Sequence, residues 1–140
     1  MAETAAQSAP PVETTPYARI GGREIVREIV DRFYNMMDSD PAYRELRAIH
    51  AEDLGPMRDS LTLFLTAWMG GPRDWFEQKP GVCMMSMHRA MPITQQLSDQ
   101  WAEAMVRSVE ADPGIDRETS DLITAAFRRM CRAMVSIPAA

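Results

Sequence analysis

The sequence predicts an all-helical domain, and three observations support this prediction. Apolar residues recur at three- and four-residue steps in four separate stretches, which is the spacing of one face of a helix. No stretch shows the strict alternation of apolar and polar residues that a half-buried strand requires. Glycine pairs and prolines stand at the ends of these stretches rather than in the middle of them.

The length of 140 residues suits one domain that folds without a disulfide or a structural metal. Residues 1–16 are rich in Ala, Pro, Thr and Glu and lack an apolar period, so we expect a disordered N-terminal tail there. The folded domain is expected to occupy residues 17–140.

The first long helix is expected between Arg23 and Asp38. Gly21-Gly22 precedes it and predicts a tight corner, and Asp40-Pro41 closes it. Its apolar face consists of Ile25, Val26, Ile29, Val30, Phe33 and Met37.

A helical turn is expected at residues 43–48, followed by a second long helix over residues 56–69. Pro56 suits the first turn of that helix, and Gly70-Gly71-Pro72 ends it. Its apolar side consists of Leu61, Phe64, Leu65 and Trp68.

The second half of the chain begins with residues 73–82, which we interpret as a loop. A short helix is predicted at residues 83–90, ending before Pro92. Two long helices follow, at about residues 94–111 and 116–136, separated by an Asp-Pro-Gly turn. Their inward faces carry Leu97, Trp101, Met105 and Val109, and then Ile123, Phe127, Met130 and Met134.

The composition argues against several classes of protein. The net charge is −5 and the basic residues are dispersed, so we expect no nucleic-acid partner. No run approaches the roughly 18 apolar residues of a membrane span. Residues 1–16 lack a basic segment followed by an apolar stretch, so we do not expect them to act as a secretory signal. The two cysteines, Cys83 and Cys131, lie in neither a zinc nor a disulfide pattern. The expected location is the cytoplasm.

Two histidines, one tyrosine and one tryptophan could carry chemistry. His88 lies in a methionine-rich segment, and a neutral imidazole in an apolar setting is a good iron ligand; the alternative is a core histidine with a backbone partner. Tyr34 can point into the core, where its hydroxyl needs a partner, or keep its tip in solvent. Trp101 could serve a site through its indole N–H, or it could simply pack in the core. His50 could likewise carry chemistry, or it could be an ordinary surface histidine. No carboxylate pair, phosphate loop or nucleophile constellation is readable.

In combination, these residues resemble a truncated haemoglobin, most closely the second of the three groups, and the similarity covers Tyr17 to Val135. Each sequence piece is weak alone, but their order and spacing together are specific. The pieces are Ile20-Gly21-Gly22, Val30-Asp31-Arg32-Phe33-Tyr34, Phe64-Leu65, Trp68-Met69-Gly70-Gly71-Pro72, His88 with Ile93, and Asp99-Gln100-Trp101 with Met105.

The resemblance implies a two-over-two helical sandwich around haem b (iron protoporphyrin IX). It implies His88 as the fifth iron ligand, and it places Tyr34, Trp101 and His50 over the distal face. It maps Met57 and Leu61 beside that face. The residues that it implies around the ring are Phe33, Phe64, Trp68, Met91 and Ile93.

This chain departs from the family pattern at three positions. His50 stands where a Tyr or Phe is common, so it could donate to a bound ligand or bind the iron itself. Met91 replaces the usual Phe after the proximal histidine. Ser60 replaces a basic residue, which leaves Arg58 and Arg89 as candidates to hold the haem propionates.

The expected function is binding of dioxygen, nitric oxide, carbon monoxide or similar small ligands at a pentacoordinate-capable iron. Three distal donors can hydrogen-bond the partial negative charge on bound dioxygen, each contributing roughly 1–3 kcal/mol. A haem enzyme with peroxidase or nitric-oxide dioxygenase activity, served by a reductase, is the alternative. A haem-free helical interaction domain is a third hypothesis. A monomer or a homodimer is expected.

Overall fold

The computed structural model describes residues 15–78 and 92–136. Over these ranges the chain forms helices and no strand, so the all-helical prediction is confirmed. In chain order the helical segments are α2 (Pro16–Ile20), α3 (Arg23–Ser39), η2 (Pro41–Tyr43), α4 (Arg44–Ala48), α5 (Gly55–Trp68), α6 (Asp74–Gln78), α8 (Gln95–Glu110) and α9 (Arg117–Ala133).

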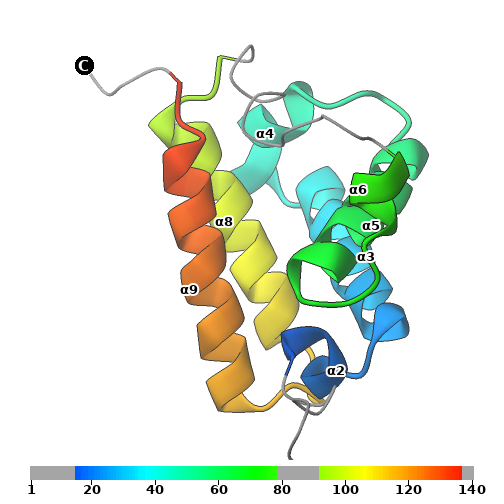
Figure 1. Ribbon diagram of the computed structural model, residues 1–140. Coiled ribbons are helices and arrows are strands. Elements are labelled where there is room, and N and C mark those ends of the chain that lie inside the picture. The colour runs from blue at the N-terminus through cyan, green and yellow to red at the C-terminus, as the bar shows by residue number, and fades with distance from the viewer. Residues whose placement is uncertain (1–14, 79–91, 137–140) are drawn as a thin grey trace, which may run out of the picture.

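The four long helices form two packed pairs. Helix α3 packs on α5 and helix α8 packs on α9, while contacts between α3 and α8 join the pairs. Figure 1 shows α8 and α9 side by side on one flank of the molecule, with α3, α5 and α6 on the other. This is the two-over-two sandwich that the resemblance implied, and the apolar faces predicted from helical spacing supply its core.

Glycines set the direction of the chain before α3. Gly21 and Gly22 have φ angles of 113° and 87°, a region that side chains with a Cβ disfavour. A Cβ on Gly21 would lie 2.9 Å from Cγ1 of Ile25. The aromatic ring of Tyr17 occupies the space against Gly71, where a Cβ would come within 2.8 Å of it. The Gly21-Gly22 corner and the glycine pair that ends α5 therefore meet, and Tyr17 packs between them.

Side-chain caps begin the two helices of the second pair. The Thr94 hydroxyl accepts a hydrogen bond from the backbone N–H of Leu97 at the start of α8. The Asp116 carboxylate accepts one from the N–H of Thr119 at the start of α9. Such caps satisfy N–H groups that have no partner inside the helix, so they fix where each helix begins.

The prediction of a loop over residues 73–82 is wrong at its start, because residues 74–78 form α6. One helical turn is too short to show apolar periodicity. Its anchor is Trp75, which is buried and meets the ring of Phe64 edge-on at 5.3 Å between centroids. The short helix predicted at residues 83–90 lies outside the described residues.

Polar contacts clamp α3 and η2 to α8. Arg32 donates to the Asp112 carboxylate at 3.1 Å and to the Ser108 carbonyl at 3.0 Å. Tyr43, a buried residue of η2, donates its hydroxyl proton to Glu103 at 2.7 Å. These contacts tie α3 and η2 to α8 and to the turn that follows it. Within the described ranges no helix has the length and apolar character needed to cross a membrane.

Candidate functional site

A cavity of about 380 Å³ lies between the two helix pairs. Its volume falls in the roughly 300–1,000 Å³ range of small-molecule and cofactor sites, and such sites are mostly apolar with a few placed polar groups. Here the walls are mainly aliphatic, aromatic and sulfur-containing. The lining residues are Tyr34, Leu46, Ile49, His50, Ala51, Met57, Ser60, Leu61, Phe64, Trp75, Ile93, Leu97, Ser98, Trp101, Met130, Cys131 and Met134.

Tyr34 brings a buried phenol to this cavity from α3. Only 2% of the residue is exposed, and its ring meets those of Phe33 at 4.9 Å and His50 at 6.1 Å between centroids. Within the described residues the Tyr34 hydroxyl has no hydrogen-bond partner. Burial raises the pKa of Tyr34 to about 12, although the positive charge of Arg58 acts in the opposite direction. The phenol therefore keeps its proton near neutral pH and is a hydrogen-bond donor.

His50 follows α4 and has a defined ring orientation. Its Nδ1 lies 2.8 Å from the carbonyl oxygen of Leu46. A carbonyl oxygen can only accept, so in the neutral ring Nδ1 carries the proton and Nε2 carries the lone pair. The expectation that His50 is a distal donor therefore needs refinement, because the neutral ring in this tautomer offers an acceptor at Nε2. It can donate from Nε2 only when it is protonated.

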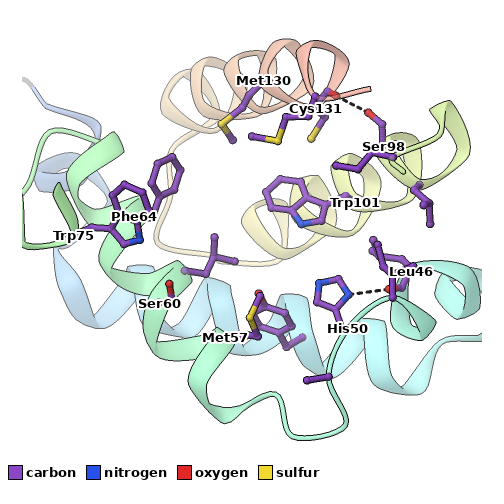
Figure 2. A pocket seen from close by; sticks show the side chains of 17 residues that line it. Leu46, His50, Met57, Ser60, Phe64, Trp75, Ser98, Trp101, Met130 and Cys131 are labelled. Carbon is purple, nitrogen blue, oxygen red and sulfur yellow. Dashed lines mark hydrogen bonds between the residues drawn. The ribbon is translucent and has the colours of Figure 1, made fainter. Parts of the chain in front are cut away.

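Trp101 projects from α8 into the middle of the cavity, between Cys131 on one side and His50 on the other (Figure 2). Its ring packs edge-on against Phe33 at 5.1 Å and Phe127 at 5.7 Å. The indole N–H makes no hydrogen bond with the described part of the chain, and an indole N–H is a donor only. Trp101 therefore supplies a second donor, held by aromatic packing.

The wall contributed by α9 is apolar and rich in sulfur. Met130, Cys131 and Met134 line it, and the Ser98 hydroxyl donates to the Cys131 backbone carbonyl at 2.9 Å. Burial raises the pKa of the Cys131 thiol to about 12, so this thiol is neutral under physiological conditions. A neutral buried thiol behaves as a small apolar group, which makes this wall a packing surface.

The structure brings together most of the predicted site residues. Two of them stand one layer further out: Phe33 is fully buried behind Trp101, and Trp68 stacks on Phe127 at 4.7 Å between centroids. His88 and Met91 lie outside the described residues. The predicted residues that line the cavity are Tyr34, His50, Met57, Leu61, Phe64, Ile93 and Trp101.

Arg58 is engaged on α3. Its Nη1 donates to the Asp31 carboxylate at 2.9 Å, and its Nη2 donates to the Asn35 side-chain oxygen at 2.7 Å. The guanidinium also lies over the Tyr34 ring, 5.7 Å from its centroid. These contacts argue against Arg58 as a propionate partner. Arg89, the other candidate, lies outside the described residues.

The rest of the lining was not predicted from the sequence to belong to the site. Met130 and Met134 were readable as inward positions of the last helix, so their helical spacing was the available signal. Leu97 carried the same signal on the inward face of the preceding helix. Trp75 could not be predicted as a lining residue, because its position depends on the short helix α6, which the sequence did not indicate. The remaining residues carry no such signal; they are Leu46, Ile49, Ala51, Ser60, Ser98 and Cys131.

Comparisons with known proteins agree with this geometry. The sequence model of the family described as bacterial-like globin matches residues 15–136. The group 2 truncated hemoglobin YjbI of Bacillus subtilis (strain 168) is 28% identical over 121 residues, which cover 86% of this chain and 88% of that protein.

Two solved structures extend the comparison. The group II 2-on-2 hemoglobin from Agrobacterium tumefaciens superposes with a TM-score of 0.84 at 28% identity, covering 95% of this chain and all of the other. The hemoglobin from Chloroflexus aurantiacus gives a TM-score of 0.78 at 31% identity, covering 88% of this chain and 98% of the other.

A two-over-two helical sandwich with an apolar cavity and a few polar groups on one side defines the class of truncated globins. The chain belongs to the bacterial-like globin family. Membership of a globin family implies a haem-binding protein that takes small gases as ligands.

Proposed function

We propose that this chain holds haem b in the cavity and reversibly binds dioxygen or a similar diatomic gas on the side of Tyr34. One observation carries the proposal: Tyr34 is only 2% exposed, it lines the cavity, and its hydroxyl has no hydrogen-bond partner within the described residues. A phenol hydroxyl that faces an apolar cavity in this way is a donor that a ligand in the cavity can satisfy.

The walls suit the flat, largely apolar haem. The lining is mainly aliphatic, aromatic and thioether side chains, and methionines adapt their shape to irregular surfaces. His88 is the proposed axial ligand, since its imidazole lies in an apolar segment of the sequence and matches the family's proximal histidine. When bound, the haem iron supplies a coordination position for a diatomic gas.

The residues of the chain then hold that gas. The Tyr34 phenol and the Trp101 indole each donate a hydrogen bond to a ligand that carries partial negative charge. Each such bond is worth roughly 1–3 kcal/mol in a site shielded from water. When the His50 ring is neutral its lone pair is on Nε2, so toward a protonated ligand it acts as an acceptor rather than as a third donor.

The experiment is an absorption spectrum of the purified protein with and without added haem. A Soret band is expected, and His88→Gly should lose haem in a way that free imidazole restores. His50→Gly is the matched control, because His50 is the other histidine of the chain and should not be required for haem retention. A colourless protein, or a His88→Gly variant that retains haem unaided, contradicts the proposal.

The spectrum of the ferric protein tests whether His50 hydrogen-bonds a ligand or binds the iron itself. If it only hydrogen-bonds, the ferric spectrum is expected to be high-spin, and His50→Ala should leave it unchanged. A low-spin, six-coordinate spectrum that this substitution converts to high-spin would instead assign Nε2 as a sixth iron ligand. We favour the hydrogen-bonding role.

The ring orientation of His50 also favours one alternative function, reduction of hydroperoxides by an external reductant. In the neutral ring with its proton on Nδ1, Nε2 is the nitrogen that can accept a proton, and Tyr34 keeps a proton to donate. The test is turnover with hydrogen peroxide and ascorbate. Peroxidase function predicts that His50→Ala lowers this turnover at least tenfold while oxygen affinity changes little; absence of turnover removes the alternative.

A further inference from the structure

We propose that Arg58 is a positioning residue for Tyr34, which clamps the phenol ring from the solvent side and orients its hydroxyl toward the ligand. The part of this proposal that concerns the ligand rests on the proposed function. The part that concerns the ring does not, because it follows from contacts within the chain.

The clamp joins two helices at the position of Tyr34. Arg58 stands in the first turns of α5 and reaches across to α3, the helix that carries Tyr34. It donates to Asp31 through both the carboxylate, at 2.9 Å, and the backbone carbonyl, at 3.3 Å. It donates to Asn35 at 2.7 Å. Asp31 and Asn35 are one helical turn apart on α3, so the two hydrogen bonds fix the guanidinium on the helix that carries Tyr34.

The guanidinium also covers the ring itself. Its central carbon lies 5.7 Å from the Tyr34 ring centroid, within the roughly 6 Å of a cation–π contact. Phe33 and His50 meet the same ring edge-on. The phenol is therefore enclosed on three sides, and the cation withdraws electron density from it. Consistent with this, Arg58 is the group that lowers the pKa of Tyr34 against the effect of burial.

Arg27 provides a matched control from the same pair of helices. It too pairs with Asp31, at 3.3 Å, and it bridges to Asp59 on α5 at 2.8 Å. No contact joins it to the Tyr34 ring, and its side chain is 41% exposed compared with 21% for Arg58. Arg27 therefore ties α3 to α5 without touching the phenol.

The main experiment compares Arg58→Met with Arg27→Met in the haem-loaded protein. Arg58→Met should release dioxygen about three- to tenfold faster, the effect of losing a partly shielded cation–π contact. The C–O stretching band of the ferrous carbonyl complex should shift toward that of Tyr34→Phe. Arg27→Met should leave both within experimental error, and Arg58→Lys should lie between. Equal effects of the two methionine variants overturn the proposal.

A double substitution separates positioning from general structure. In the Tyr34→Phe background, Arg58→Met should change dioxygen release less than twofold, because no hydroxyl remains to be oriented. An effect as large as in the wild-type background means that Arg58 acts by a route other than Tyr34, and it overturns the proposal.

Fluorine NMR tests the clamp without any ligand chemistry. The chain has three tyrosines, so 3-fluorotyrosine labelling gives three resonances, and Tyr34→Phe identifies that of Tyr34. Arg58→Met should shift the Tyr34 resonance, whereas Arg27→Met should not. The Tyr17 and Tyr43 resonances report in the same spectrum whether the fold is retained. An unmoved Tyr34 resonance rejects the clamp even if haem binds, and a shifted one supports it even if haem does not.

Discussion

The two walls of the cavity are held in different ways. On the α3–α5 wall, directed polar contacts converge on Tyr34: the guanidinium of Arg58 is fixed by Asp31 and Asn35 and covers the phenol ring. On the α8–α9 wall, the residues are held mainly by the packing of apolar side chains. Phe127 packs between Trp68 and Trp101. The Ser98 hydroxyl of α8 donates a hydrogen bond to a backbone carbonyl of α9.

This difference predicts that the walls respond to substitution in different ways. Packing in a close-packed interior contributes mainly to stability, because lost contacts and cavities raise the free energy of the fold. A hydrogen-bond donor that faces the ligand stabilises the bound ligand, so its loss affects ligand binding more than the stability of the fold. Changes on the α8–α9 wall should lower stability, and changes on the α3–α5 wall should alter ligand release.

Phe127→Ala is expected to have the largest effect. The side chain is fully buried and touches two tryptophan rings, so its removal should lower the free energy of unfolding by about 3–5 kcal/mol. Urea denaturation measures this loss. Leu122→Ala on the same helix is the control, since Leu122 is 53% exposed and should change stability by about 0.5 kcal/mol or less. A loss at Phe127 no larger than at Leu122 would show that this wall does not depend on packing.

Tyr34→Phe should have the next largest effect, and on ligand release rather than on stability. Loss of one shielded hydrogen bond of about 1–3 kcal/mol speeds dioxygen release roughly 5- to 150-fold. The hydroxyl has no partner within the described chain, so stability should stay equal or rise slightly. Stopped-flow release and urea denaturation measure the two quantities. An unchanged off-rate would remove Tyr34 from the mechanism.

Cys131 gives the packed wall a dependence on pH. Its pKa is raised by burial from 9.0 to about 12, so between these values the unfolded chain loses a proton that the folded chain keeps. Stability should therefore be complete below pH 9 and fall as the pH rises above it, by at most about 1.4 kcal/mol per pH unit from this group. Cys131→Ala should flatten the slope of urea stability between pH 9 and 10.5. An equal slope in the variant means that the thiol is not the group that titrates.

The same contrast explains how much could be predicted from the sequence. The three- and four-residue spacing of apolar residues indicates where a long amphipathic helix lies. The ends of α3, α5, α8 and α9 were therefore predicted to within a few residues. Helix α6 was not, because one turn has no period and depends on the burial of Trp75 against Phe64.

The site followed the same rule. Tyr34 and Trp101 were candidates as polar-tipped aromatics on apolar helix faces, and the resemblance to truncated haemoglobins placed them over the distal face. The fold shows that both line the cavity. The role proposed for Arg58 was not identifiable from the sequence, since a guanidinium on a polar helix face gives no sign of which ring it covers. The tautomer of His50 likewise depends on a carbonyl four residues earlier, and only the folded chain fixes that distance.

The smallest effect is expected where a polar contact has no buried partner. Arg117 and Asp121 form an ion pair at 3.5 Å on the outer face of α9, with side chains 91% and 65% exposed. Water screens such a pair and its side chains lose freedom, so Asp121→Asn should change stability by about 0.3 kcal/mol or less. Urea denaturation at low and high salt should give the same small difference. A loss above about 1 kcal/mol would mean that ion pairs on this fold stabilise it without burial.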